Sequence, residues 1–166
     1  MKPLRLDVII TFFLLALLFT ACGGNAQNAN SAKPANAANS NSEKPNVTKT
    51  NVEELGMLVN IPYEAEESLW REDGAHKKIT AILRFSAADC DKVVADSQKF
   101  RAPENVAIPS EAWFPDELIA QGQLSGDNTL KGVSYGANAF FQDAFNGGRV
   151  IRIEGTNYFV LEISAK

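Results

Sequence analysis

Apolar and polar residues alternate with a period of two near the end of the chain, the spacing expected of β-strands. Residues 149–154 show this alternation, residues 158–163 form a mostly apolar run, and the loop 155–157 between them predicts a hairpin. The side chains expected to share the buried face of this hairpin are Ile151, Ile153, Phe159, Leu161 and Ile163. The side chains expected to face water are Arg152, Glu154 and Glu162.

Three further segments are expected to be strands. Residues 66–72 and 79–85 flank a turn at Asp73-Gly74, and residues 130–135 form another strand nearer the hairpin. Residues 106–108 are expected to be a brief extended piece before Pro109. In the segment 79–85, the side chains that share one face are Ile79, Ala81, Leu83 and Phe85.

A helical period of 3.6 residues appears between these strands. The expected helices are a short one that begins at Thr50 or Asn51 and ends before Pro62, one from Ser86 to residues 101–103, and one from Pro115 to Gln121. Residues 137–145 are expected to form a helical turn or an irregular crossing that buries Phe140, Phe141 and Phe145. Because strands that are adjacent in sequence favour antiparallel pairing, we predict an α+β fold. Residues 51–166 would be one small domain, with a mostly antiparallel sheet and helices on one face.

The N-terminal pattern is different. Lys2 and Arg5 precede an almost entirely apolar run over residues 8–19, which small residues close at Thr20-Ala21. This is the pattern of an export signal. As a helix, the run with its small-residue end would span roughly 21 Å, short of the roughly 30 Å hydrocarbon core of a bilayer. We therefore predict a removable signal peptide over residues 1–21.

The end of this signal, Phe19-Thr20-Ala21-Cys22, resembles the lipobox of bacterial lipoproteins, although the family usually has Leu where Phe19 stands. The resemblance covers residues 1–23. It implies that Cys22 becomes the lipidated first residue and attaches the protein to a membrane. Gly23 after this Cys implies the periplasmic side of the outer membrane if the host has two membranes, and otherwise the outer face of the plasma membrane. The alternative is secretion of a soluble form, with Cys22 incidental.

Residues 22–50 form the predicted tether. From Gly23 onward they are mostly Gly, Asn, Ala, Gln, Ser, Lys and Pro, with no aromatic residue, so we expect disorder. Residues 51–166 hold 11 Lys or Arg against 18 Asp or Glu, a net charge of −7. Such a domain repels phosphate backbones, which argues against nucleic acid as a partner.

Little catalytic chemistry is apparent. His76 is the only histidine, and it lies in an expected turn with no nucleophile elbow nearby in sequence. Gly147-Gly148-Arg149 lacks the Lys-Ser/Thr of a phosphate-binding loop. One acidic cluster comprises Glu64, Glu66, Glu67, Glu72 and Asp73. These carboxylates could coordinate a hard cation, but we favour the interpretation that they form a solvated strand edge. We predict no catalytic residue, cofactor or metal.

Cys90 is expected to have a structural role. Ser86 and Asp89 form a capping box, which places Phe85 and Cys90 at the two positions of a hydrophobic staple. If Cys22 is lipidated, Cys90 is the only free thiol, and no internal disulfide can form.

Trp113 and Phe114 are the candidate binding residues, because aromatic side chains are favoured anchors at interfaces. The alternative is that both fill the core beneath the helix at Pro115. Two functions remain open: a lipid-anchored, non-catalytic module that binds an envelope protein or glycan, and a small extracytoplasmic hydrolase that uses acidic residues. We favour the binding module. Two carboxylates within about 10 Å in one pocket would favour the hydrolase.

Overall fold

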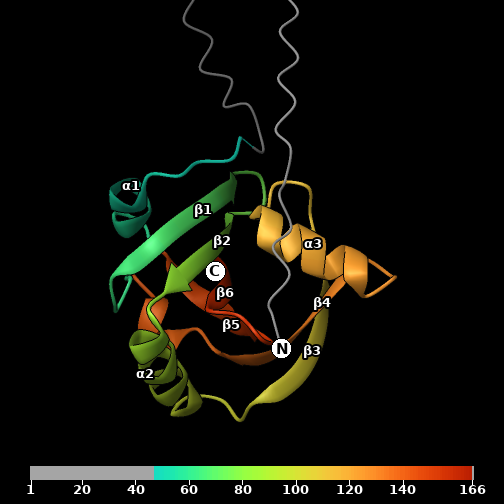
Figure 1. Ribbon diagram of the computed structural model, residues 1–166. Coiled ribbons are helices and arrows are strands. Elements are labelled where there is room, and N and C mark those ends of the chain that lie inside the picture. Colours follow the sequence, from blue (N-terminus) through green and yellow to red (C-terminus); the bar gives the residue numbers. More distant parts are fainter. Residues whose placement is uncertain (1–46, 166) are drawn as a thin grey trace, which may run out of the picture. The chain divides into compact units, whose positions relative to one another are not determined.

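The computed structural model describes residues 47–165, which form a six-stranded sheet with short helices (Figure 1). The strands are β1 (Ala65–Asp73), β2 (Lys78–Phe85), β3 (Glu104–Pro109), β4 (Thr129–Gly136), β5 (Phe145–Ile153) and β6 (Tyr158–Ala165). Their order in the sheet is β1-β2-β6-β5-β4-β3, and all neighbours are antiparallel. The predicted α+β class with an antiparallel sheet is confirmed.

The helices are divided between the two faces of the sheet, whereas the sequence predicted them on one face. They are α1 (Val52–Gly56), α2 (Ala87–Gln98), α3 (Asp116–Leu124) and the 3-10 turn η1 (Asn138–Phe140). α1, α2 and η1 contribute to one apolar cluster, and α3 contributes to a second. Both faces need cover because the strands place apolar side chains on each of them.

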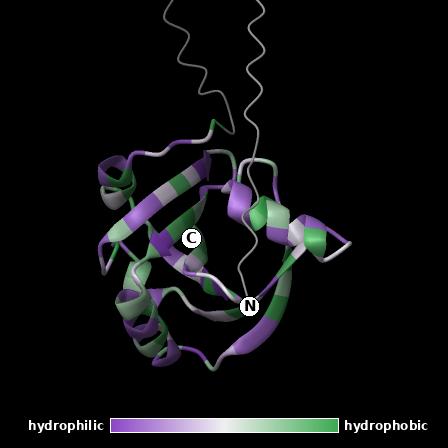
Figure 2. Cartoon of the chain, in the orientation of Figure 1, coloured by the Kyte–Doolittle hydropathy of each residue, from purple (hydrophilic) through white to green (hydrophobic). Residues whose placement is uncertain are grey.

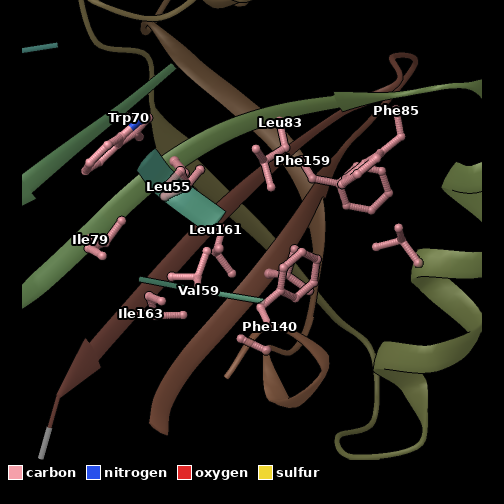
Figure 3. Close-up of a cluster of buried hydrophobic side chains, with 14 of the residues drawn as sticks. Leu55, Val59, Trp70, Ile79, Leu83, Phe85, Phe140, Phe159, Leu161 and Ile163 are labelled. Atoms are coloured by element: carbon pink, nitrogen blue, oxygen red, sulfur yellow. The ribbon is translucent and has the colours of Figure 1, made fainter. Parts of the chain in front are cut away.

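The first core lies under α1, α2 and η1 (Figure 3). Its large, fully buried side chains are Leu55, Trp70, Ile79, Leu83, Phe85, Phe140 and Phe159. The predicted shared face of the β2 segment is confirmed, since all four of its members belong to this core. Phe140 is buried here, and Phe141 and Phe145 are partly buried against the same core, as predicted for residues 137–145.

The second core lies on the opposite face under α3, and it corrects the predicted packing of the last hairpin. Ile151 and Ile153 belong to this second core, whereas Phe159 and Leu161 belong to the first. The error arose because β5 and β6 are central strands that are buried on both faces, so two alternating sets of side chains are apolar. The edge strand β1 differs from these central strands, since polar and apolar residues follow one another along it in bands (Figure 2).

The start of α2 agrees with its sequence signal. Ser86 Oγ accepts a hydrogen bond from the Asp89 backbone N–H at 3.2 Å and donates to the Asp89 carboxylate at 2.8 Å. Cys90 is fully buried in the first core next to Phe85, as the staple predicts. Burial raises the pKa of the Cys90 thiol, so this group is held in its neutral form.

The outer edge of β1 is covered by residues that the sequence had assigned to the tether. The Lys49 backbone exchanges two hydrogen bonds with Trp70, of 2.8 and 2.9 Å, and Arg71 Nε donates to Thr48 Oγ1 at 2.8 Å. The Lys49 ammonium lies 4.3 Å from the centre of the Trp70 ring. The ordered domain therefore begins before residue 51. No helix within residues 47–165 combines the length and apolar character needed to cross a membrane.

Candidate functional site

Trp113 and Phe114 are both in the second core. Trp113 is 8% exposed and Phe114 is 5% exposed, and their rings meet edge to face with centroids 4.9 Å apart. Trp113 Nε1 donates to Glu111 at 2.7 Å, and the Arg71 guanidinium lies 4.7 Å from the Trp113 ring centre. The core alternative is therefore correct, and the two residues present no exposed aromatic surface for docking.

The other residues singled out in the sequence show no convergence on a reaction centre. The lipidation candidate Cys22 lies outside the described residues. His76 is an exposed turn residue whose Nδ1 lies 2.7 Å from Asp73 Oδ2, and this hydrogen bond lowers the pKa of the Asp73 carboxyl. Within residues 47–165, no group of three or more His, Cys, Asp or Glu side chains is arranged to hold a metal ion.

One pair of carboxylates does come together at the start of β1. The pairing of β1 with β2 shifts register between Ala65 and Glu67, and Glu66 and Glu67 both lie close to Arg84 of β2. Arg84 Nε is 3.4 Å from Glu66 Oε2 and 3.8 Å from Glu67 Oε2. Both carboxylates therefore form ion pairs with one guanidinium. The arrangement is a partly exposed ion-pair network at the edge of the sheet.

Tyr158 completes this network from β6. Its side chain is buried, and its hydroxyl donates to Glu67 Oε2 at 2.7 Å. Burial and the hydrogen bond to Glu67 raise the pKa of Tyr158 to about 12. The group is therefore a neutral hydrogen-bond donor at physiological pH and cannot act as a base.

This network predicts how stability depends on alkaline pH. Between pH 10 and 12 the unfolded chain loses the Tyr158 proton that the folded state keeps, so the free energy of unfolding falls as pH rises. The loss should reach about 3 kcal/mol above the folded-state pKa, and Tyr158→Phe should abolish the part of the pH dependence that comes from this group. Urea unfolding of both proteins across this range measures the effect. If the free energy of unfolding fell equally with pH in the natural protein and in Tyr158→Phe, the buried hydrogen bond from Tyr158 to Glu67 would be contradicted.

The candidate binding site is a groove of about 780 Å³ over β3, β4 and β5, away from the Glu66–Glu67–Arg84 network. The residues that line it come from β3, β4, β5 and the β5–β6 turn: Asn105, Val106, Lys131, Gly132, Val133, Arg152, Ile153, Glu154, Gly155, Thr156 and Asn157. Val133 packs against the first core, and Arg152 Nη1 reaches Asp91 of α2 at 3.2 Å. The groove therefore opens on the face of the sheet against which α2 packs.

The end of the β4–β5 ladder gives the groove its form. Gly132 pairs with Ile153 in the register of this ladder, and the Glu154 backbone N–H then donates to the Lys131 carbonyl. A Cβ atom on Gly132 would lie 2.5 Å from the Arg152 carbonyl oxygen. Only glycine permits β4 to approach β5 so closely, and the regular pairing ends at this point.

The polar side chains of the groove are available to a ligand. Asn105, Lys131, Glu154 and Asn157 are all exposed, and none of their side chains makes a hydrogen bond to another group in the described part of the chain. Lys131 offers three donors, Glu154 offers acceptors, and each Asn offers both. Such a mixed set suits a polar ligand with its own donors and acceptors, such as a peptide segment or a glycan.

The sequence carries no local signal for this groove. Its lining extends from Asn105 to Asn157, and no single segment within that range has a recognisable motif. The exposed polar positions of β3 and β4 alternate with apolar ones, which is equally the pattern of an ordinary solvated strand. The comparisons with known proteins add no assignment, since no family model, curated protein or solved structure matches this chain.

Proposed function

We propose that this protein is a lipid-anchored component of the bacterial cell envelope whose folded domain binds a partner and does not catalyse a reaction. The anchor is proposed from the lipobox-like Phe19-Thr20-Ala21-Cys22 after an apolar export signal. On this proposal, Cys22 is acylated and the protein faces the periplasm from the outer membrane, or the exterior of a single membrane. The predicted tether leaves the domain free to turn toward its partner.

The observation that supports a binding role is the groove between β3 and β5. Its lining comes from three strands and a turn and includes no residue of a described helix, and four exposed polar side chains line it without side-chain hydrogen-bond partners in residues 47–165. A groove of this volume lies within the range of small-molecule and peptide sites. The partner class that fits is an envelope protein segment or a glycan, which hydrogen bonds from amides and charges can recognise.

The hydrolase alternative has the Glu66–Glu67 pair as its support. These carboxylates both lie against the Arg84 guanidinium, and the groove lies elsewhere, with Glu154 as the single carboxylate in its lining. A reaction by paired acids would need two carboxylates around one substrate bond. The binding module is therefore the function that the geometry favours.

Site-specific photo-crosslinking tests the binding role. A photoreactive residue placed at Lys131 or Asn105 of the full chain should form a defined adduct in intact cells. The matched control is the same residue at Gln123, which is exposed on α3 and lies outside the groove. A protein partner gives an adduct of one size, and a glycan gives an adduct that glycan-cleaving enzymes shorten. Equal adducts at Gln123, or none at the groove positions, would contradict the proposal.

A further inference from the structure

We infer that a second, smaller pocket of this domain binds a phosphate group. The pocket has a volume of about 320 Å³, and three cationic side chains line it: Lys78, Arg101 and Arg149. Glu162 is the one acidic side chain in its lining. The pocket is distinct from the groove, with which it shares no residue.

The sheet brings these cations together from distant parts of the sequence. Lys78 is the first residue of β2 and pairs with Ser164 of β6, while Arg149 of β5 pairs with Glu162 of β6. Arg101 follows α2, and its side chain starts beside Gly136 at the end of β4. Three separate segments thus place a positive charge around one concavity.

This charge is opposite to that of the domain as a whole. Residues 51–166 carry a net charge of −7, whereas the lining of the pocket carries three positive charges against one negative charge. Clustered cations repel one another, and Glu162 is the single carboxylate in the lining that offsets them. The arrangement favours an anion in the pocket.

Most of the hydrogen-bond donors of these side chains remain free. Arg149 Nε is held by Glu162 at 2.7 Å, which fixes the guanidinium and leaves its two terminal nitrogens for a ligand. Lys78 Nζ lies 3.9 Å from the same carboxylate, too far for a hydrogen bond. Arg101 makes no ion pair with any group in residues 47–165. Two guanidinium groups and an ammonium match a tetrahedral oxyanion such as phosphate.

The position of the pocket suggests the source of the phosphate. Lys78 pairs with Asp73 at the end of β1, and the chain enters the described domain beside that end, where Thr48 accepts from Arg71. The groove lies toward the opposite end of the strands, at Ile153 of β5. If the proposed anchor at Cys22 is correct, the pocket lies at the end of the sheet where the tether enters the described domain, and phospholipid headgroups are phosphates within its reach.

Phosphate binding can be tested without relying on the anchor. The full chain in uncharged detergent is titrated with inorganic phosphate, and separately with micelles that contain phosphatidylglycerol, while the Gly148 amide is followed by NMR. Lys78→Gln combined with Arg101→Gln should weaken the affinity by about tenfold or more. The control combines Lys92→Gln with Lys99→Gln, which removes the same charge at exposed positions that line neither the pocket nor the groove and should leave the affinity within about twofold.

The outcomes separate the sources. A response to inorganic phosphate supports a site for a soluble phosphate group, and a response only to phosphatidylglycerol supports a site for a lipid headgroup. No response to either probe, or equal weakening in the two double variants, overturns the inference. Acylation of Cys22 is determined independently by mass spectrometry, so a missing anchor and a missing phosphate site give different results.

Discussion

Gly148→Ala should destabilise the domain by about 3 kcal/mol or more. Gly148 has a φ of +141°, a conformation that residues with a Cβ atom rarely adopt. A Cβ at this position would lie 2.1 Å from the Glu162 carbonyl oxygen and 2.8 Å from the Ile163 Cα. Both contacts are with the backbone of β6, which cannot move without disrupting the central β5–β6 ladder. Urea unfolding followed by circular dichroism measures the loss.

Gly147→Ala is the matched control. Gly147 is adjacent in β5, but its φ is not positive, and the nearest heavy atom to an added methyl group would be Ser164 Oγ at an ordinary 3.4 Å. The same chemical change should therefore alter the free energy of unfolding by less than about 1 kcal/mol. Equal effects of the two substitutions would show that strand propensity, and not the close approach of β5 to β6, governs this position.

Cys22→Ser should abolish acylation and release the protein from membranes. Each buried methylene contributes about 0.8 kcal/mol, and two or more acyl chains give stable anchoring. A serine hydroxyl cannot form the thioether on which this attachment depends. The measurements are incorporation of a labelled fatty acid, the mass of the processed N-terminal residue, and the fraction of protein that remains with washed membranes.

Cys90→Ser is the control for this experiment, because it removes the other cysteine of the chain. Cys90 is fully buried, so it is inaccessible to acylation in the folded domain, and this variant should keep the label and the membrane association. Label retained by Cys22→Ser, or an unacylated N-terminal residue in the natural protein, would exclude the lipid anchor. A soluble secreted form would then be the correct alternative.

The elements with local signals were predictable from the sequence. The capping box at Ser86 places the start of α2, because its hydrogen bonds involve neighbouring residues only. The turn after Asp73 and the loop 155–157 define two hairpins for the same reason. These features need no knowledge of the rest of the chain.

The packing of the aromatic residues was not settled by such signals. The sequence 113–114 is equally compatible with an exposed binding loop and with a plug beneath α3, and only the second core shows that the plug is correct. In the same way, the sequence could not show that Ile151 and Ile153 face a different core from Phe159 and Leu161, because that depends on helices covering both faces of β5 and β6. That cover comes from α2 and α3, which are distant in the sequence.

Local sequence signals were sufficient for the α+β class, the hairpins, the start of α2 and the structural role of Cys90, because each depends on residues within a few positions of one another. They also carry the whole basis for the proposed export and lipidation. The order of the strands, the division of helices between two faces, the groove and the cationic pocket became visible only in the folded domain. These depend on long-range pairing, which brings Lys78, Arg101 and Arg149 together from three segments that share no local pattern.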